Sequence, residues 1–71
     1  MKTKPKPAPT LGQRIEAARK AAGLTRRALA LLVDTSEMYL YQLERDKRGP
    51  SLAILRRIAQ ALGVSPGALT D

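Results

Sequence analysis

The 71-residue sequence contains no cysteine and no histidine, and it has only six acidic residues. Without cysteine, neither a disulfide nor a zinc–thiolate site can stabilise the fold. Without histidine, the usual general base and the commonest metal ligand are both missing. The acids are scattered, so the sequence shows neither an acid–base pair nor a metal-binding cluster. These absences predict that the chain is not an enzyme and holds no metal or other cofactor.

Long apolar stretches are also absent. The longest run, residues 28–33, has six residues, whereas a helix that crosses a bilayer needs about 20. The basic N-terminal segment is not followed by the apolar stretch of a signal peptide. We therefore expect no membrane-spanning segment and a cytoplasmic location.

Positive charge is the dominant feature of what is present. Thirteen Lys and Arg residues give a net charge of +7, which predicts a polyanionic partner, either nucleic acid or an anionic membrane surface. A merely solubilising surface would have the same composition. Residues 1–9, MKTKPKPAP, are too polar and too rich in Pro to fold, and we expect a disordered, extended tail. Its Lys2, Lys4 and Lys6 either form an arm that contacts DNA phosphates or belong to a solvated leader, and they would bind a membrane only loosely.

Five short helices are predicted in one all-α domain, residues 10–71. Thr10 and Gln13 match a capping box, and the next three helix starts have cap candidates at Thr25, Ser36 and Ser51. The expected helices are residues 11–22, 26–33, 36–45 and 52–62, with a last short turn at Ser65-Pro66. Apolar residues recur at helical spacing and predict the buried faces: Leu11, Ile15, Ala18 and Ala22; Leu29, Ala30 and Val33; Leu40 and Leu43; Leu52, Leu55, Ile58, Ala59 and Leu62. The short connection at residues 34–36 is typical of a helix-turn-helix unit formed by the second and third helices.

Residues 11–69 resemble the Cro/repressor (XRE-type) helix-turn-helix family. The matching segments are LGQRIEAARKAAGLT, ALALLVDTS, YLYQLERDKRGPSL and LRRIAQALGVSPGAL. The resemblance implies a compact five-helix bundle of the lambda-repressor-like type, of bacterial, phage or plasmid origin. Small stand-alone members are phage repressors, antitoxins and restriction–modification controller proteins, and they usually bind palindromic operators as homodimers. The function implied is a sequence-specific DNA-binding transcriptional regulator, a repressor or controller, whose helix 36–45 reads the major groove.

Four positions depart from the family pattern. Asp34 and Asp46 stand where the family usually has Gly, and Asp tolerates the left-handed backbone region better than most residues. Arg26 replaces the usual Gln at the start of the second helix. The usual polar pair in the middle of that helix is Leu31-Leu32.

The resemblance places several side chains against base edges: Glu37, Met38 and Gln42, with Tyr41 as a further candidate. Gln pairs with adenine, Glu accepts from cytosine, and an apolar group touches the thymine methyl. Structural alternatives remain, because Glu37 suits a helix N-terminus and Met38 could fill a gap in the core.

Cations and hydroxyl groups are the candidate phosphate contacts: Arg26, Arg27, Ser36, Tyr39, Lys47 and Arg48. Two Arg residues in the first turn of the second helix would oppose its dipole unless an anion lies in front of them, and a phosphate would be that anion. Tyr39 could instead pack at the domain edge, and Lys47 and Arg48 could belong to a solvated loop. The resemblance also pairs Arg19 with Glu44 in a structural ion pair between the first and third helices.

A second function class is a protein-interaction module, such as an antitoxin or antiactivator built on the same scaffold. Exposed Leu31 and Leu32, with Met38 and the two Tyr residues, would supply the apolar surface that such a protein partner needs. The positions of the cations separate the two hypotheses. A protein-binding module has no need of cations both at the start of the second helix and in the loop after the third. The sequence therefore favours double-stranded DNA as the partner.

Overall fold

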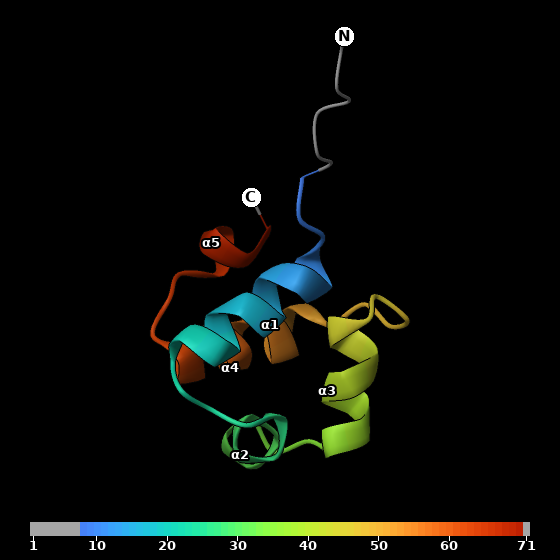
Figure 1. The fold of residues 1–71 in the computed structure, drawn as a ribbon, viewed down its shortest axis with the longest axis vertical. Helices are drawn as coiled ribbons and strands as arrows, with labels where there is room; N and C mark the ends of the chain where they lie inside the picture. Colours follow the sequence, from blue (N-terminus) through green and yellow to red (C-terminus); the bar gives the residue numbers. More distant parts are fainter. Residues whose placement is uncertain (1–7, 71) are drawn as a thin grey trace, which may run out of the picture.

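The computed structural model describes residues 8–70 and contains five α-helices in this range (Figure 1). They are α1 (Leu11–Ala21), α2 (Arg26–Leu32), α3 (Glu37–Glu44), α4 (Leu52–Leu62) and α5 (Pro66–Thr70). The described residues contain no strand, so the predicted all-α class is confirmed. Within this part of the chain, no helix is long and apolar enough to cross a membrane. Lys2, Lys4 and Lys6 lie outside the described residues, and the division into a tail (1–9) and a domain (10–71) stays a prediction.

Side-chain caps begin the first four helices, as the sequence predicts. The Thr10 hydroxyl accepts the Gln13 amide at 3.1 Å, and the Gln13 side chain accepts the Thr10 amide at 2.9 Å. The other three capping hydroxyls, of Thr25, Ser36 and Ser51, each accept an amide three residues later at 3.0–3.2 Å. These bonds satisfy backbone donors that have no partner inside the helix.

The first four helices end in the same way, with a residue in the left-handed conformation. These residues are Gly23 (φ 73°), Asp34 (φ 56°), Asp46 (φ 58°) and Gly63 (φ 71°). The amide that follows each of them donates to the carbonyl five residues earlier, at 2.9–3.1 Å. This is the hydrogen bond of a Schellman motif, whose left-handed position usually carries Gly. The two Asp residues that replace the family's Gly therefore adopt the conformation for which Gly is normally required.

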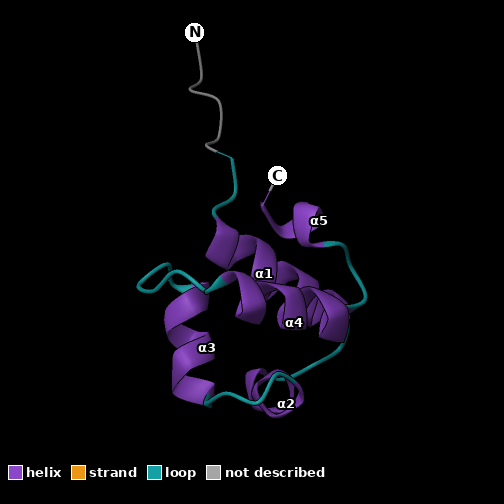
Figure 2. Ribbon diagram, turned by 180° about the vertical axis from the view of Figure 1, so that it is seen from behind, coloured by secondary structure: helices purple, strands orange, loops and turns teal. Residues whose placement is uncertain are grey.

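The helix-turn-helix unit lies at the lower edge of the molecule in Figure 1. There α2 is seen almost along its axis and α3 from the side, so the two helices cross steeply. The reverse view shows α1 and α4 above α2 and beside the upper end of α3, with α5 next to α1 (Figure 2). The core lies where these helices meet, and its fully buried side chains are Ile15, Leu29, Val33, Leu40, Leu43, Ile58 and Leu69.

Two residues of the predicted apolar stripes are exposed, and two others, Leu11 and Ala18, are only partly buried. Leu52 is 61% exposed and Ala22 is also exposed. Both lie at an end of a helix, where the stripe extends past the neighbouring helices. The other members of the α4 stripe are buried as predicted: Leu55, Ile58, Ala59 and Leu62.

The last turn of α3 lies directly on the first turn of α1. A Cβ atom on Gly12 would be only 2.4 Å from the carbonyl oxygen of Leu43 and 2.6 Å from that of Glu44. The carboxylate of Asp46 completes the junction, because its Oδ1 accepts the Gly12 amide at 2.9 Å and its Oδ2 accepts the Thr10 hydroxyl. Asp46 thus compensates its unfavourable backbone conformation by capping α1, and the start of α1 fixes the position of α3.

Candidate nucleic-acid interface

Helix α3 divides its side chains between the core and the surface. Leu40, Leu43 and Glu44 are buried, whereas the predicted base-contacting residues lie at least partly on the surface. Met38 is 63% exposed and Tyr41 is 37% exposed; Glu37 is exposed as well, and Gln42 is half-buried. The alternative that Met38 fills a gap in the core is therefore wrong.

A shallow, open depression lies between α3 and the start of α2. Arg26, Glu37, Met38 and Tyr41 line it. Three of these four are predicted base contacts, and the fourth, Arg26, comes from the preceding helix. The depression joins the exposed side of α3 to the N-terminal end of α2.

A buried carboxylate holds three helices together at the back of this region. The Glu44 side chain is completely buried, and its Oε2 accepts the Arg19 Nε–H at 2.7 Å. Arg19 Nη2 also donates to Glu44 Oε1 at 3.2 Å, and Arg19 Nη1 donates to the Leu24 carbonyl at 2.8 Å. The Arg19–Glu44 pair that the resemblance implies is thus present between α1 and α3. Every buried side-chain nitrogen and oxygen in the described part of the chain has a hydrogen-bond partner.

Arg26 joins the same carboxylate from α2. Its Nε and Nη2 both donate to Glu44 Oε1 at 3.1 Å, and its Cζ lies 5.2 Å from the centroid of the Tyr41 ring. The sequence analysis expected a phosphate to be the anion in front of Arg26. In the structure the Glu44 carboxylate is that anion, so the charge argument for a phosphate at Arg26 no longer holds.

The other predicted phosphate contacts come from α2, from α3 with its N-cap, and from the loop that follows α3. Ser36 is exposed at the N-cap of α3, Arg27 is exposed in the first turn of α2, and Lys47 and Arg48 are exposed in the loop that follows α3. Tyr39 is half-buried against the core, with the Arg48 guanidinium 5.8 Å from its ring. Exposed cations therefore lie in the first turn of α2 and in the loop that follows α3.

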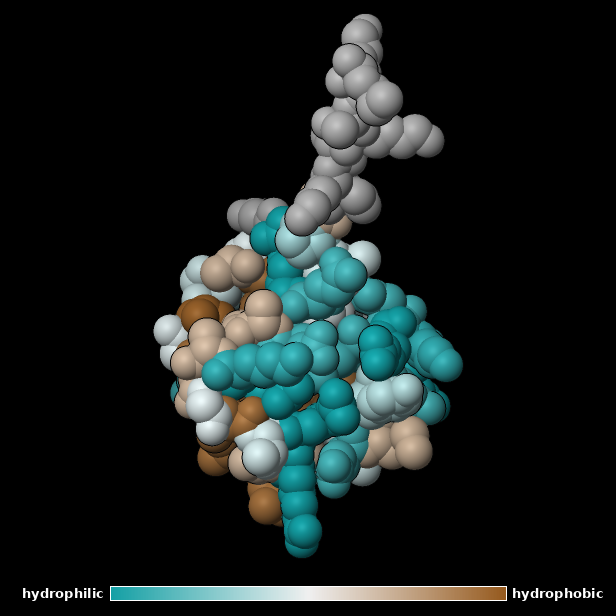
Figure 3. Space-filling model, in the orientation of Figure 1, coloured by the Kyte–Doolittle hydropathy of each residue, from teal (hydrophilic) through white to brown (hydrophobic). Residues whose placement is uncertain are grey.

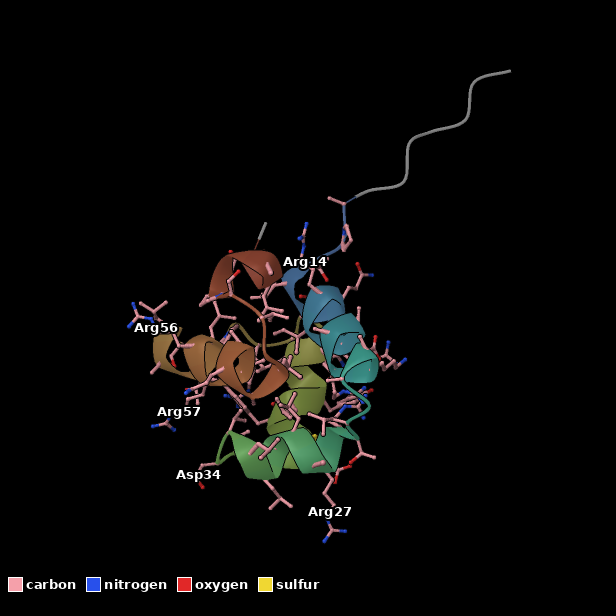
Figure 4. The ribbon with its side chains drawn as sticks, turned by 90° about the vertical axis from the view of Figure 1, so that its left-hand side faces the viewer. Arg14, Arg27, Asp34, Arg56 and Arg57 are labelled. Atoms are coloured by element: carbon pink, nitrogen blue, oxygen red, sulfur yellow. The ribbon has the colours of Figure 1, made fainter. Side chains whose placement is uncertain are left out.

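The two cations of α4 do not belong to this face. Figure 4 shows Arg27 projecting from one end of α2, with Asp34 at the other end, whereas Arg56 and Arg57 project from α4 on another side of the molecule. Both α4 side chains are exposed. These two cations therefore project away from the side of the molecule on which Arg27 lies.

The exposed apolar residues include the pair that departs from the family pattern. Leu31 is 75% exposed and Leu32 is 62% exposed. In Figure 3 hydrophilic side chains cover much of the visible face, while apolar atoms reach the surface at its lower edge, over α2. The structure thus leaves both leucines uncovered in a single chain.

The sequence analysis missed three features that fix α3 or its side chains in position. The Arg45 guanidinium lies 5.7 Å from the Tyr41 ring centroid, a contact that the four-residue spacing on one helix face could have indicated. Gly12 was also missed, although an isolated Gly within a helical pattern often has a packing reason. The hydrogen bonds of Asp46 to Thr10 and Gly12 span 36 and 34 residues, so no local pattern could have shown them.

Comparison with known proteins decides the family. The family model described as "Helix-turn-helix" matches residues 15–69, which include most of α1 and all of α2, α3 and α4. The chain belongs to the Cro/repressor (XRE-type) helix-turn-helix family.

Relatives of this helix-turn-helix chain include the immunity repressor protein of Bacillus phage phi105, which is 45% identical over 60 residues. That match covers 84% of this chain but only 42% of the repressor, so the chain spans less than half the length of this relative. This relative is a repressor, and the family consists of transcriptional regulators rather than enzymes, in agreement with the prediction that the chain is not an enzyme.

Solved structures resemble the whole helical bundle. The P22 c2 repressor in complex with a synthetic operator superposes with a TM-score of 0.85 at 31% identity, covering 90% of this chain and 97% of the repressor. The restriction–modification controller protein C.AhdI from Aeromonas hydrophila superposes with a TM-score of 0.80 at 36% identity, covering 83% of this chain and 89% of the controller. The five-helix fold of this helix-turn-helix family is thus confirmed for the present chain.

Proposed function

We propose that this chain is a sequence-specific DNA-binding transcriptional regulator, a repressor or controller, whose α3 reads the major groove. The observation that carries the proposal is the face of α3 whose four predicted base contacts lie at least partly on the surface, together with exposed Arg27 on α2 and exposed Lys47 and Arg48 in the loop after α3. The four predicted base contacts are Glu37, Met38, Tyr41 and Gln42. The relatives support the proposal, because the similar P22 c2 repressor structure contains an operator.

The chemistry of this face suits base edges. Gln42 can donate to and accept from adenine, Glu37 can accept from the cytosine amino group, and the Met38 side chain can contact a thymine methyl group. Arg27, Ser36, Lys47 and Arg48 would contact phosphates, and Tyr39 would do so through its hydroxyl. Lys2, Lys4 and Lys6 would extend these contacts as an N-terminal arm. Phosphate contacts position the protein on DNA, whereas base contacts select the sequence.

We further propose that the chain acts as a homodimer on a palindromic operator, as the family resemblance implies. Leu31 and Leu32 are exposed side by side and would be covered by a second subunit or by another protein. The alternative of a pure protein-interaction module rests on these two leucines together with exposed Met38 and Tyr41. The relatives named above favour the DNA-binding function instead.

The salt dependence of binding tests the proposal. About four to six phosphate contacts per subunit should give log K against log salt concentration a slope of about −4 to −5 per subunit. Fluorescence anisotropy with labelled duplexes would measure this slope. Arg48→Ala should reduce its magnitude by about one, whereas Arg56→Ala on α4 should leave it unchanged. A wild-type slope near zero would exclude the proposed function.

A substitution of Gln42 tests base reading separately. Gln42→Ala should relax the preference at one position of each half-site and cost about 1–3 kcal/mol on the best sequence, with much less effect on other sequences. Lys47→Ala is the matched control on the same face and should weaken all sequences by a similar factor. Selection from a random duplex pool, followed by titration of the selected and scrambled sequences, would measure both effects. An equal loss on every sequence for Gln42→Ala would mean that α3 is assigned in the wrong register.

A further inference from the structure

We infer that Arg26 is a positioning residue that holds Tyr41 in place on the DNA-facing side of α3, and that it does not act as a phosphate clamp. The inference rests on the proposed function and concerns how sequence preference is set. It also changes the role that the sequence alone suggests for Arg26.

The first observation is the attachment of Arg26 to Glu44. Two of its nitrogens, Nε and Nη2, donate to the same carboxylate oxygen at 3.1 Å. The Glu44 side chain is completely buried, and the Arg26 side chain is only 26% exposed. Glu44 is fixed in turn by Arg19 from α1, so the Arg26 guanidinium is held against a carboxylate that cannot move with it.

The second observation is the contact between Arg26 and Tyr41. The Arg26 Cζ lies 5.2 Å from the ring centroid, within the range of a cation–π interaction. Arg45 approaches the same ring at 5.7 Å. The Tyr41 ring is thus held between the guanidinium groups of Arg26 on α2 and of Arg45, the residue that follows α3, and Arg26 is bonded to the buried Glu44 carboxylate.

The third observation is where this arrangement lies. Arg26 and Tyr41 line the same depression as Glu37 and Met38, two of the predicted base contacts. A ring that is fixed before binding loses less side-chain freedom when it meets a base edge. The contacts from Glu44 to Arg26 and from Arg26 to Tyr41 therefore fix the Tyr41 ring at the edge of the proposed base-reading surface before DNA binds.

A phosphate contact by Arg26 would compete with this network. A phosphate in front of α2 would have to draw the guanidinium from a buried carboxylate and an aromatic ring at once. Arg27, the next residue, is exposed and makes no ion pair among the described residues. Arg27 is therefore the residue at this helix end that is free to contact the backbone of DNA.

The substitution Arg26→Lys distinguishes a residue that positions Tyr41 from one that clamps a phosphate. The ammonium group of lysine keeps the charge of Arg26, but it lacks the planar fork that bonds Glu44 and lies on the Tyr41 ring at the same time. If Arg26 clamps a phosphate, Arg26→Lys should retain most of the binding. If Arg26 positions Tyr41, Arg26→Lys should lose sequence preference although the charge is conserved.

The experiment compares Arg26→Lys and Arg26→Ala with Arg27→Ala, using one selected duplex and one scrambled duplex at several salt concentrations. We expect both Arg26 variants to weaken binding to the selected duplex by about tenfold, with little change on the scrambled duplex and an unchanged salt slope. Arg27→Ala should weaken both duplexes equally and reduce the slope by about one. If Arg26→Ala behaves like Arg27→Ala and Arg26→Lys restores binding, Arg26 is a clamp and the inference is overturned.

Two further measurements do not depend on the choice of duplex. NMR signals of the Tyr41 ring in the free protein should shift in Arg26→Lys and stay unchanged in Arg27→Ala, and unshifted signals in Arg26→Lys would overturn the inference. In a Tyr41→Ala background, Arg26→Lys should cause no further loss of preference, and an additional tenfold loss there would show that Arg26 acts by another route. If the wild-type chain prefers no sequence, the proposed function fails, whereas the ring signals still decide the role of Arg26.

Discussion

Glu44→Ala is expected to lower the free energy of unfolding by about 3–5 kcal/mol, because it leaves a buried guanidinium without its carboxylate. Arg19 is only 7% exposed and has Glu44 and the Leu24 carbonyl as its partners. Arg26 loses both of its hydrogen bonds to Glu44 in the same substitution. A domain of this size is only marginally stable, so this variant should be largely unfolded at room temperature. Urea unfolding followed by circular dichroism would measure the loss.

The matched control is the exposed ion pair on α1. Glu16 lies 3.6 Å from Lys20, whose side chain is 66% exposed, and Glu16→Ala should change stability by no more than about 0.5 kcal/mol. Glu44→Gln keeps the side-chain shape and one acceptor, so its cost should lie between those of the two alanine variants. A Glu44→Ala protein as stable as Glu16→Ala would show that the buried pair does not hold the helices together.

Gly12→Ala is the second substitution with a large expected effect. Whether it raises or lowers the free energy of unfolding shows which of two effects dominates, helix propensity or steric clash. Alanine favours a helix interior over glycine by about 1 kcal/mol, so helix propensity alone predicts a more stable protein. The new Cβ atom, however, would lie 2.4 Å and 2.6 Å from two backbone oxygens at the end of α3. Backbone atoms cannot rotate away as a side chain does, so α1 and α3 must separate. We expect a net loss of about 1–3 kcal/mol or more, measured by urea unfolding.

Gly49 supplies the control for this substitution. No atom lies within 4 Å of a Cβ built on Gly49, and its φ is not in the left-handed region. Gly49→Ala should therefore change stability by no more than about 0.5 kcal/mol. A Gly12→Ala protein that is more stable than the wild type would mean that α1 and α3 lie farther apart than in this structure. Because Gly12 fixes α3 on α1, the variant should also weaken DNA binding in proportion to the unfolded fraction.

Local signals determined the helices and their ends. The hydroxyl caps of Thr10, Thr25, Ser36 and Ser51 were predicted because a cap depends only on residues within one helical turn. The left-handed conformation of Asp34 and Asp46 could likewise be anticipated, since Asp stands at positions where the family has Gly. Burial of Leu40 and Leu43 followed from helical spacing together with the neighbouring core stripe on α2. The exceptions, Ala22 and Leu52, lie at helix ends, where spacing alone does not show whether a neighbouring helix covers the stripe.

Local sequence signals could not predict the contacts between residues that are distant in the chain. The sequence pattern alone suggested a phosphate as the anion facing Arg26, but the facing carboxylate belongs to Glu44, 18 residues away. Family resemblance pointed to the partner of Arg19 and did not extend to Arg26, because Arg26 is itself a departure from the family. Similarly, no local rule connects Asp46 with the start of α1.

The sequence by itself thus determined the all-α class, the four cap positions and the cations at the start of α2 and in the loop after α3, because each depends on composition or on residues close together in the chain. Only the tertiary structure decided which cations are available to DNA. It places Arg26 on a buried carboxylate and leaves Arg27, Lys47 and Arg48 exposed. The physical reason is that the steep crossing of α2 and α3 and the close approach of α1 bring charges together from three helices. The availability of a charged side chain depends on such neighbours in space, which are distant in sequence.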